Sequence, residues 1–536
     1  MENGVRSVTI VGGGTAGWMT AGILHHLLNQ ASHRPKIKIT LIESPNIPTV
    51  GVGEATVPAM PNLLYHLGVD EDDFFRRCNA SFKLGVRFVD WSRDKNGRPD
   101  SFVHPFNQPD LVDGQSPGDL YQKFGLEDPN LDFGHAMLVS DDLIDRKKAP
   151  RNAKDPNYKF AVGYAYHMDA GRFGVFMREL MLEQGVELIT DNLVDVTKDE
   201  RGFITALMLE QRGDHPVELV IDCTGFKGLL IHGHMGEPFE SYGDSLLCDR
   251  ALAVQIPHAN PTEIEPCTRS IGLGAGWSWR VPLYSRVGTG YVFSSAFRSD
   301  DEAIDEFLTH LKARGERVEK AEPRALAMRV GRSRRSWVNN CVAIGLAGGF
   351  IEPLESTAIY MIENAASWIC RHFPYDGFEN VKTEHYNHMM TQLHEEIRDF
   401  IQLHYLTSNR DSDFWHAARS DVAVSDRLAE NLKIWKERFP QRRDMETVHL
   451  FGEWSYLFVL QARHYFDQTP APDNPALTEE KWQSYCDQLK EKKQGLLKYL
   501  NSHYEVLTQM RDRALMGSLT TGQAAETPTA KEFSIV

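Results

Sequence analysis

The chain has 536 residues, of which 42% are hydrophobic and 25% are charged, and its formal net charge is −16. This length and composition allow a large core divided into two or three domains. The negative charge argues against sequence-independent binding of nucleic acid, which needs a basic surface. No apolar stretch approaches the roughly 18 residues of a membrane span. The N-terminus runs directly into an apolar strand, so we expect no signal peptide.

The cysteines and histidines indicate neither disulfides nor a metal site. The seven cysteines are scattered, odd in number and never spaced as C-x-x-C, which is typical of reduced thiols in a cytoplasmic protein. The pair His385 and His388 and the pair His394 and His404 belong to no recognisable set of ligand spacings. We therefore expect a cytoplasmic location and no bound metal.

The clearest pattern is an apolar run, residues 8–11, that enters the glycine loop 12–17 with G-x-G-x-x-G spacing. Residues 18–28 then predict a helix, and residues 37–42 predict a second strand that ends at Glu43. Glycines let the backbone turn tightly and approach a pyrophosphate at the positive end of the helix. An acid after the second strand can accept hydrogen bonds from the adenosine ribose. Together these features predict a dinucleotide-binding βαβ unit, and the alternative is a tight turn without a ligand.

Beyond this unit the sequence predicts a long ordered loop and then a strand. Residues 44–58 contain several prolines and glycines, and such a loop either covers a nearby cofactor or is an ordinary surface connection. Residues 80–91 alternate apolar and polar side chains, which predicts a strand with Lys83 on its solvated face. From His104 past Pro150 we expect irregular structure, because no periodicity is clear.

The middle of the chain continues the α/β pattern, with a helix and then strands predicted at 173–183, 186–189, 203–210 and 218–221. The last strand runs into Asp222, which is either a second contact to the dinucleotide or a turn-forming carboxylate. Residues 237–321 lose this rhythm and predict a β-rich insertion. Within it Trp277 and Trp279 share one face of a strand, an arrangement that core packing also explains.

A further strand and glycine loop occupy residues 342–350, and a helix follows with Ser356 or Thr357 as a natural N-cap. The unpaired amides of such a helix start form an anion site of low specificity, and an ordinary capped helix is the alternative. The C-terminal part is predicted to be helical at 395–406, 425–439, 446–466 and 479–503. The small, polar segment 517–536 predicts a loose tail.

Several ordered motifs together resemble the flavin-dependent tryptophan halogenases over most of the chain, to about residue 416. They are Gly-Gly-Gly-Thr-Ala-Gly-Trp-Met at 12–19, Gly-Val-Gly-Glu-Ala-Thr-Val-Pro at 51–58, Phe-Lys-Leu-Gly at 82–85, His-Pro-Phe at 104–106, Asp-Cys-Thr-Gly-Phe at 222–226, W-x-W-x-V-P at 277–282, and the runs 345–357 and 398–405. Val281 departs from the isoleucine of the family's tryptophan run.

The resemblance implies an α/β fold built on a Rossmann-like FAD-binding domain of the flavoprotein monooxygenase type. That domain would be discontinuous, with a β-rich insertion at 237–321, a helical substrate-binding domain at 381–516 and a flexible tail at 517–536. The FAD-binding parts would be 1–100, 151–236 and 322–380.

The resemblance also implies the cofactor and the partner. FAD, used as FADH2, would contact Gly12, Gly13, Gly14, Thr15, Ala16, Gly17, Glu43, Ser44, Ile47, Glu54, Ala55, Asp222, Leu346 and Ile359. The chain has one dinucleotide fingerprint and no second unit for NAD(P)H. A separate NAD(P)H-dependent flavin reductase would therefore supply the FADH2.

The family's active-site lysine and glutamate fall on Lys83 and Glu355, and its halide would lie against the amides of Thr357 and Ala358. The substrate-pocket positions fall on His104, Phe106 and Ser356. The implied reaction oxidises chloride or bromide with O2 to hypohalous acid, which Lys83 guides to an indole-type aromatic, indole or tryptophan. Glu355 would stabilise the cationic intermediate and take the proton.

Two other functions compete with this one. A single-component flavin-dependent aromatic monooxygenase would take hydride from NAD(P)H, but it has no need of Lys83, Glu355 or the tryptophan pair. A flavin-binding protein without enzymatic activity would explain the glycine loop but not these residues.

The sequence departs from the family where a tryptophan substrate would be held. The tryptophan-specific members carry two adjacent tyrosines in a late helix, and the nearest candidate here is Tyr456 followed by Leu457. A hydrogen-bonded clamp discriminates strongly between substrates, whereas an apolar pocket does so weakly. Because no clamp for the amino-acid part is identifiable, the sequence favours free indole-type arenes over tryptophan.

Overall fold

The computed structural model describes residues 4–30, 34–47, 53–94, 97–126, 128 and 131–520, except for the side chains of 517–520. A six-stranded sheet has the order β20-β21-β12-β1-β2-β8. Its central strand β1 (Ser7–Val11) pairs in parallel with β2 (Lys38–Glu43) and with β12 (Leu219–Asp222). The other strands are β8 (Glu187–Thr190), β20 (Trp337–Val338) and β21 (Cys341–Ala343).

Helix α1 (Thr15–Asn29) follows β1 and contacts α7 (Ala170–Glu183) and α9 (Ala358–Arg371). Val8, Ile10 and Trp18 are fully buried, so the strand and the helix share one core. The predicted βαβ unit is therefore confirmed. Helix α1 begins three residues before the predicted start, because residues 15–17 are small and carry little of the apolar pattern.

The second layer is a seven-stranded sheet with the order β18-β14-β17-β16-β15-β5-β6. Its strands are β18 (Arg324–Ala327), β14 (Arg250–Ile256), β17 (Val287–Phe293), β16 (Gly276–Pro282), β15 (Thr268–Leu273), β5 (Gly85–Arg93) and β6 (Pro99–Pro105). The segment 237–321 is rich in strands, as predicted, but it also contains helix α8 (Asp300–Ala313). The sheet takes β5, β6 and β18 from outside that segment.

Residues 80–91 form two strands rather than the single predicted strand. Strand β4 (Ser81–Lys83) belongs to a small sheet with β3 (Gly53–Ala55) and β7 (Ala165–Asp169), whereas β5 joins the seven-stranded sheet. The two strands separate at Leu84, whose amide donates to the carbonyl oxygen of Pro266. Both faces of β4 are covered, so Lys83 is buried and the predicted solvated face does not exist.

Two more three-stranded sheets complete the β structure. Their strands are β9 (Leu193–Lys198), β10 (Ile204–Leu209) and β11 (Gly213–Pro216) in one, and β13 (Phe239–Ser241), β19 (Gly331–Ser333) and β22 (Gly349–Phe350) in the other.

The region between His104 and Pro150 is more ordered than the sequence predicted. It contains α4 (Pro117–Leu120), the π-helical turn η1 (Tyr121–Gly125), α5 (Phe133–Met137) and α6 (Ser140–Asp145). These helices are too short to show a 3.6-residue period, and only α5 has a side-chain cap, in which Asp132 accepts from the amide of His135. The earlier helices α2 (Ala59–His66) and α3 (Glu71–Arg77) are similarly short.

The C-terminal part is helical, as predicted, with α10 (Asn380–Leu406), α11 (Asp413–Ser420), α12 (Asp426–Ile434), α13 (Glu453–Ala462), α14 (Glu479–Tyr499) and α15 (His503–Thr520). The side chain of Ser425 caps α12, as predicted. The helix predicted at 446–466 is shorter, and that at 479–503 ends at Tyr499 before α15 starts. Helix α15 includes residues 517–520, which the sequence assigned to the tail, and the rest of the tail lies outside the described residues.

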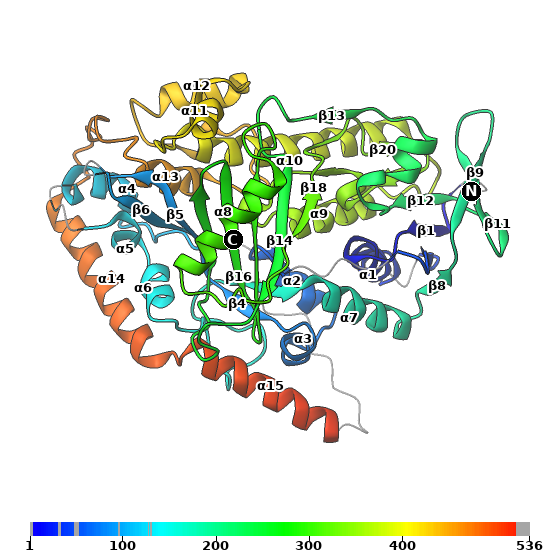
Figure 1. Cartoon of the computed structure of the whole chain (residues 1–536), viewed down its shortest axis with the longest axis horizontal. Coiled ribbons are helices and arrows are strands. Elements are labelled where there is room, and N and C mark those ends of the chain that lie inside the picture. Colours follow the sequence, from blue (N-terminus) through cyan, green and yellow to red (C-terminus); the bar gives the residue numbers. More distant parts are fainter. Residues whose placement is uncertain are drawn as a thin grey trace.

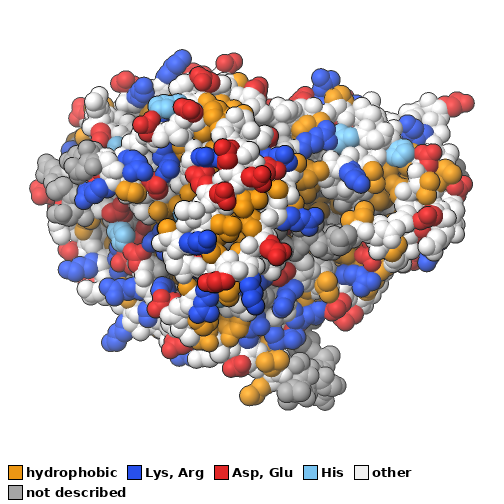
Figure 2. All heavy atoms as spheres, viewed as in Figure 1, with side chains coloured by type: hydrophobic (Ala, Val, Ile, Leu, Met, Phe, Trp, Pro, Cys, Tyr) orange, Lys and Arg blue, Asp and Glu red, His pale blue; other side chains and the backbone are white. Residues whose placement is uncertain are grey.

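Figure 1 places β1, α1 and β12 toward one end of the molecule and α4, α5, α13 and α14 toward the other, with the long seven-stranded sheet between them. Figure 2 shows acidic and basic side chains interspersed over the same face. All seven cysteines are free thiols. Within the described ranges, none of the helices combines the length and the hydropathy that crossing a lipid bilayer requires.

Candidate functional site

The glycine loop has the shape of a phosphate cradle. A Cβ atom on Gly12 would lie 2.3 Å from the carbonyl oxygen of Cys223, and one on Gly17 would lie 1.8 Å from the carbonyl oxygen of Gly12. A Cβ atom on Gly14 would meet nothing within 4 Å. Gly14 precedes α1, whose first turn has no side-chain cap and no acidic residue. Open space beside uncapped helix amides is what a pyrophosphate needs, so these residues fit the predicted dinucleotide.

The acid at the end of β2 lies beside this loop. A Cβ atom on Gly13 would lie 2.4 Å from Oε2 of Glu43, so the glycine is required for the close approach. Oε1 of Glu43 is 3.5 Å from Nε of Arg178. The nearby Ile47 and Leu346 are 69% and 38% exposed, and both side chains are therefore accessible to a ligand.

Three other residues predicted to bind the cofactor have partners within the protein. The carboxylate of Asp222 accepts four hydrogen bonds, from the amides of Thr224, Leu230 and Ile231 and from the hydroxyl of Thr224. These bonds match the turn-forming role that the sequence left open for Asp222. Ser44 donates to Oδ1 of Asn192 over 2.6 Å, and Ile359 is buried in the core.

Glu54 and Ala55 lie on β3, which pairs with β7 next to β4. Burial raises the pKa of Glu54 to about 7. The residues just before β3, Gly51 and Val52 of the predicted FAD-covering loop, lie outside the described residues. Strand β3 therefore connects the cofactor side of the fold to the strand that carries Lys83.

Lys83 is fully buried, and its ammonium has two hydrogen-bond acceptors. Nζ donates to the carbonyl oxygen of Thr56 and to Oγ of Ser356, both over 2.9 Å. It also lies 5.0 Å from the centre of the Phe106 ring. Burial lowers the pKa of Lys83 to about 7, although the negative charge of Glu355 opposes this effect. Near neutral pH this side chain is therefore close to the balance between amine and ammonium.

Glu355, at the end of the short helix η5 (Pro353–Glu355), is held between two histidines. Oε2 of Glu355 is 3.0 Å from Nδ1 of His104, and Oε1 is 2.9 Å from Nε2 of His404. Burial favours the neutral acid, but the charge and hydrogen bond of His104 and the hydrogen bond of His404 lower the pKa of Glu355 to about 2. The carboxylate is therefore ionised at neutral pH although it is buried.

The start of α9 brings the predicted halide-binding residues to the same place. Ser356 has a left-handed backbone with φ 63° and ψ 37°, which is unusual for a residue other than glycine. This turn lets its hydroxyl accept from Lys83. Thr357 is the N-cap of α9, but its side chain makes no capping hydrogen bond. The amides of the first turn, including that of Ala358, are therefore not capped by it.

A pocket of about 310 Å³ lies beside these groups. Its lining includes Glu355, His104 and Phe106. Phe451, Trp454 and Phe458 also line it, so several aromatic rings form part of its walls. Among the described residues of this lining there is neither lysine nor arginine, and Glu355 is the one acidic residue. Tyr456 packs on Phe400 and Trp435 and does not line the pocket.

The structure adds three residues that sequence reasoning missed, namely His404, Glu352 and Tyr405. The sequence indicated no catalytic role for His404, yet it holds Glu355. Glu352 accepts hydrogen bonds on Oε2 from Nε1 of Trp277, over 3.0 Å, and from the hydroxyl of Tyr405, over 2.6 Å. Burial raises the pKa of Glu352 to about 7. The signal was the run 398–405, which contains His404 and Tyr405 and was quoted only as part of the resemblance.

Trp277 and Trp279 lie on β16 with ring centres 6.4 Å apart. A Cβ atom on Gly290 of the next strand would lie 2.0 Å from Cη2 of Trp279, so that ring covers the glycine. Trp277 is buried, and core packing is part of the role of both residues.

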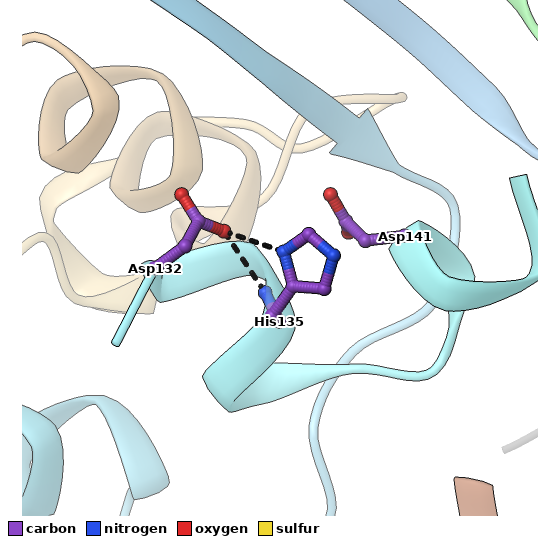
Figure 3. Close-up of side chains that lie close together, drawn as sticks. All are labelled: Asp132, His135 and Asp141. Atoms are coloured by element: carbon purple, nitrogen blue, oxygen red, sulfur yellow. Dashed lines mark hydrogen bonds and ion pairs between the residues drawn. The ribbon is translucent and has the colours of Figure 1, made fainter. Parts of the chain in front are cut away.

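Within the described ranges, one group of side chains could together supply metal ligands, namely Asp132, His135 and Asp141 (Figure 3). A hydrogen bond with Asp132 is the main cause that raises the pKa of His135 to about 9, against the effect of burial. Nδ1 and Nε2 of His135 lie 3.0 Å and 3.3 Å from oxygens of Asp132 and Asp145. A protonated His135 thus pairs with these carboxylates, and none of the group lines the 310 Å³ pocket.

The chain is similar to known tryptophan halogenases in sequence and in structure. A family model described as tryptophan halogenase matches residues 7–479. The tryptophan 6-halogenase ThaL of Streptomyces albogriseolus is 38% identical over 82% of this chain and 83% of its own length. The tryptophan 7-halogenase RebH of Lentzea aerocolonigenes is 32% identical over 96% of this chain and its whole length, 100%. The crystal structure of a tryptophan halogenase from Shewanella frigidimarina has a TM-score of 0.89 at 34% identity, and the match covers 95% of this chain and 98% of that one.

Proposed function

Since this chain belongs to the tryptophan halogenase family and is a flavin-dependent halogenase, we propose that it halogenates an indole-type aromatic with Lys83 and Glu355 as its catalytic residues. The observation that carries the proposal is the buried pair itself. A carboxylate with a pKa of about 2 lines the pocket, and a lysine with a pKa of about 7 lies behind its wall, 5.0 Å from the centre of the Phe106 ring. Perturbed pKa values of this kind are typical of catalytic groups.

The cofactor is FAD in its reduced form. The cradle at Gly12–Gly17 would hold its pyrophosphate, and Glu43 its adenosine ribose. When bound, the reduced flavin supplies, with O2, the oxidising power that converts chloride or bromide into hypohalous acid. The other predicted contacts, including Ile47, Glu54 and Leu346, would surround the remainder of the cofactor.

The halide would lie against the backbone amides of Thr357 and Ala358. These amides are at the positive end of α9, and no side-chain cap from Thr357 competes for them. They are adjacent in sequence to Ser356, which bonds to Lys83. An anion held here is therefore close to the lysine that guides the oxidised halogen.

Lys83 directs the electrophilic halogen to the ring. As an ammonium it donates a hydrogen bond to hypohalous acid, and as a free amine it is a nucleophile toward halogen. The two acceptors of Nζ, the carbonyl oxygen of Thr56 and Oγ of Ser356, fix its direction. The centre of the Phe106 ring, which belongs to the pocket wall, is 5.0 Å from Nζ. Nζ would therefore be near the aromatic ring of a substrate in the pocket.

Glu355 completes the substitution. Its carboxylate stabilises the positive charge that develops on the ring, and it accepts the proton that the carbon loses. His104 and His404 keep it ionised before the reaction. His404 lies on α10, beyond the pocket lining, and serves as a positioning residue for Glu355.

The pocket favours an indole ring without a free carboxylate beside it. The described residues of its lining include no lysine or arginine, and a carboxylate buried among them would lose hydration without gaining a cation. The aromatic rings in its walls suit the ring itself. The relatives named above are tryptophan halogenases by name, so free tryptophan is the comparison substrate in the test.

The test uses the purified chain with FAD, bromide or chloride, and NADH, with and without a separate flavin reductase. Indole, tryptamine and tryptophan are the substrates, and product masses are recorded. We expect halogenated products only with the reductase, and more from indole and tryptamine than from tryptophan. Oxygenated products, or rapid NADH oxidation by the isolated chain, would instead indicate a monooxygenase.

A further inference from the structure

The wall of the substrate pocket includes a loop that immediately precedes α13. Leu450, Phe451 and Gly452 line the pocket, and residues 449–452 belong to neither a helix nor a strand. The amides of such a loop receive no acceptors from a helix or a sheet ladder, yet buried amides need hydrogen bonds. The group that supplies these acceptors therefore decides where this part of the wall stands.

The carboxylate of Glu396, on α10, supplies them. Its Oε2 accepts from the amide of His449 over 2.8 Å. Its Oε1 accepts from the amides of Leu450, over 2.8 Å, and Phe451, over 2.9 Å. Glu396 is only 4% exposed, so water does not compete for these bonds. Three successive amides form a concave anion site, and hydrogen bonds to a charged acceptor are among the stronger ones in proteins.

The loop is also held at two further points. The hydroxyl of Tyr360, on α9, donates to the carbonyl oxygen of His449 over 2.5 Å. The ring of Phe451 stacks on the ring of Phe400, on α10, with the ring centres 3.9 Å apart. The loop is therefore fixed both from α9 and from α10.

One side of α10 holds the pocket wall and the carboxylate of Glu355 together. Glu396, Phe400 and His404 follow one another at steps of four residues, so they lie along one side of the helix. Glu396 and Phe400 contact the loop, whereas His404 bonds to Glu355. The rings of Phe400 and His404 are also in contact, with centres 5.2 Å apart. A single helix thus sets the position of the wall relative to Glu355.

We propose that Glu396 is a positioning residue for the substrate: its carboxylate holds the loop 449–451 in the pocket wall and thereby fixes Phe451 beside the bound indole ring. This inference rests on the proposed function of the pocket. It also means that these three amides are not available to the carboxylate of a free amino acid, because they already donate to Glu396.

The test is a graded pair of substitutions. Glu396→Gln keeps the shape but has one acceptor oxygen and sets an NH2 group against an amide, and Glu396→Leu removes all three hydrogen bonds. We expect KM for indole to rise in that order, by roughly tenfold in the leucine variant, which corresponds to the loss of one charge-assisted hydrogen bond. The value of kcat should change much less, because the lost interaction positions the substrate before and during the reaction alike.

Glu395→Gln is the matched control. Glu395 precedes Glu396 on α10, its side chain is 36% exposed, and it lies 3.8 Å from Arg332. This variant should keep the native KM. Oxidation of FADH2 without substrate should be native in all three variants, because the glycine loop is unchanged, and this measurement detects a general loss of folding.

Calorimetric binding of indole in the presence of oxidised FAD gives a readout independent of turnover, and Kd should rise in parallel with KM. Unchanged KM and Kd in Glu396→Leu would overturn the inference, and so would a fall in FADH2 oxidation as large as the loss of halogenation. The glutamine variant decides if the leucine variant does not fold. A native chain that halogenates no indole-type substrate would overturn the proposed function instead, and calorimetry would still decide whether Glu396 governs binding.

Discussion

Oε1 of Glu355 lies 2.9 Å from Nε2 of His404, and both side chains are buried. Burial lowers the pKa of His404 to about 4, so near neutral pH the ring is uncharged and its Nε2–H donates a hydrogen bond to the carboxylate. The ring also stacks on Phe88 at 4.4 Å. His404 therefore fixes the orientation of the Glu355 carboxylate and helps to keep it ionised.

Glu355→Gln keeps the shape but removes the negative charge and the base. We expect kcat to fall by roughly 10²-fold, the scale of one positioned acid–base group. The substrate affinity should change little. Steady-state kinetics on indole check this, and an unchanged kcat would eliminate Glu355 as a catalytic residue.

His404→Phe should preserve the stacking on Phe88 and remove one of the two hydrogen bonds to Glu355. The native pKa of Glu355, about 2, keeps it ionised throughout the working range. The variant lacks one of the hydrogen bonds that oppose the effect of burial, so the pKa of Glu355 rises. As the pH is lowered, the variant should therefore lose activity at a higher pH than the native chain does. The pH profile of kcat measures the shift. His416→Phe, at an exposed histidine of α11, is the control and should keep the native profile.

Lys83→Met should abolish halogenation while FADH2 binding and oxidation stay nearly intact, because Lys83 lies on β4 and not in the glycine loop. Product formation and flavin reoxidation are measured on the same sample. Lys159→Met, at an exposed lysine, is the matched control. Halogenation by Lys83→Met at a near-native rate would show that the assigned role is wrong.

The buried Lys83 also predicts a pH-dependent stability. Its pKa is about 7 in the folded chain and about 10.4 when unfolded, so between these values the unfolded state binds more protons and stability rises with pH. The slope from this one group approaches ~1.4 kcal/mol per pH unit. The measurement is the difference in unfolding free energy between the native chain and Lys83→Met, followed from pH 7 to 9. This difference isolates the contribution of Lys83 to the pH dependence of stability. A difference independent of pH would contradict a lowered pKa.

Glu352 is expected to hold Trp277 in place. Glu352→Gln keeps an acceptor for Nε1 of Trp277 and for the hydroxyl of Tyr405, whereas Glu352→Leu removes both bonds. We expect the leucine variant to oxidise more FADH2 per halogenated product, and the glutamine variant to resemble the native enzyme. The ratio of peroxide to product, measured for both, decides. An equal ratio of peroxide to product in the two variants would show that the hydrogen bonds of Glu352 have no role in this ratio.

Ala358 sits at the first position of α9, where the halide is proposed to bind. A glycine at this position would allow closer approach of the backbone to an ion. Chloride is smaller and more strongly hydrated than bromide, so imperfect donors cost it more. We expect bromide to be preferred and Ala358→Gly to shift the ratio toward chloride. Competition at equal concentrations tests this, and a native preference for chloride or an unchanged ratio would refute it.

The sequence by itself determined the nucleotide-binding unit and the family. A βαβ unit is contiguous, and its glycine spacing, strand period and helix period are local properties that short-range contacts produce. The N-cap of α12 was predictable for the same reason. Lys83 and Glu355 were identified through the motifs of the resemblance and not through any local period.

Only the tertiary structure decided what surrounds those two residues. The separation of β4 from β5 at Leu84 buries Lys83, which the alternating pattern assigned to solvent. His404 and Glu355 are 49 residues apart in sequence, and Glu352 meets Trp277 across 75 residues. Burial and the pairing of charges depend on such distant contacts. A local pattern of side chains does not report these contacts, so burial and charge pairing are decided only when the layers pack.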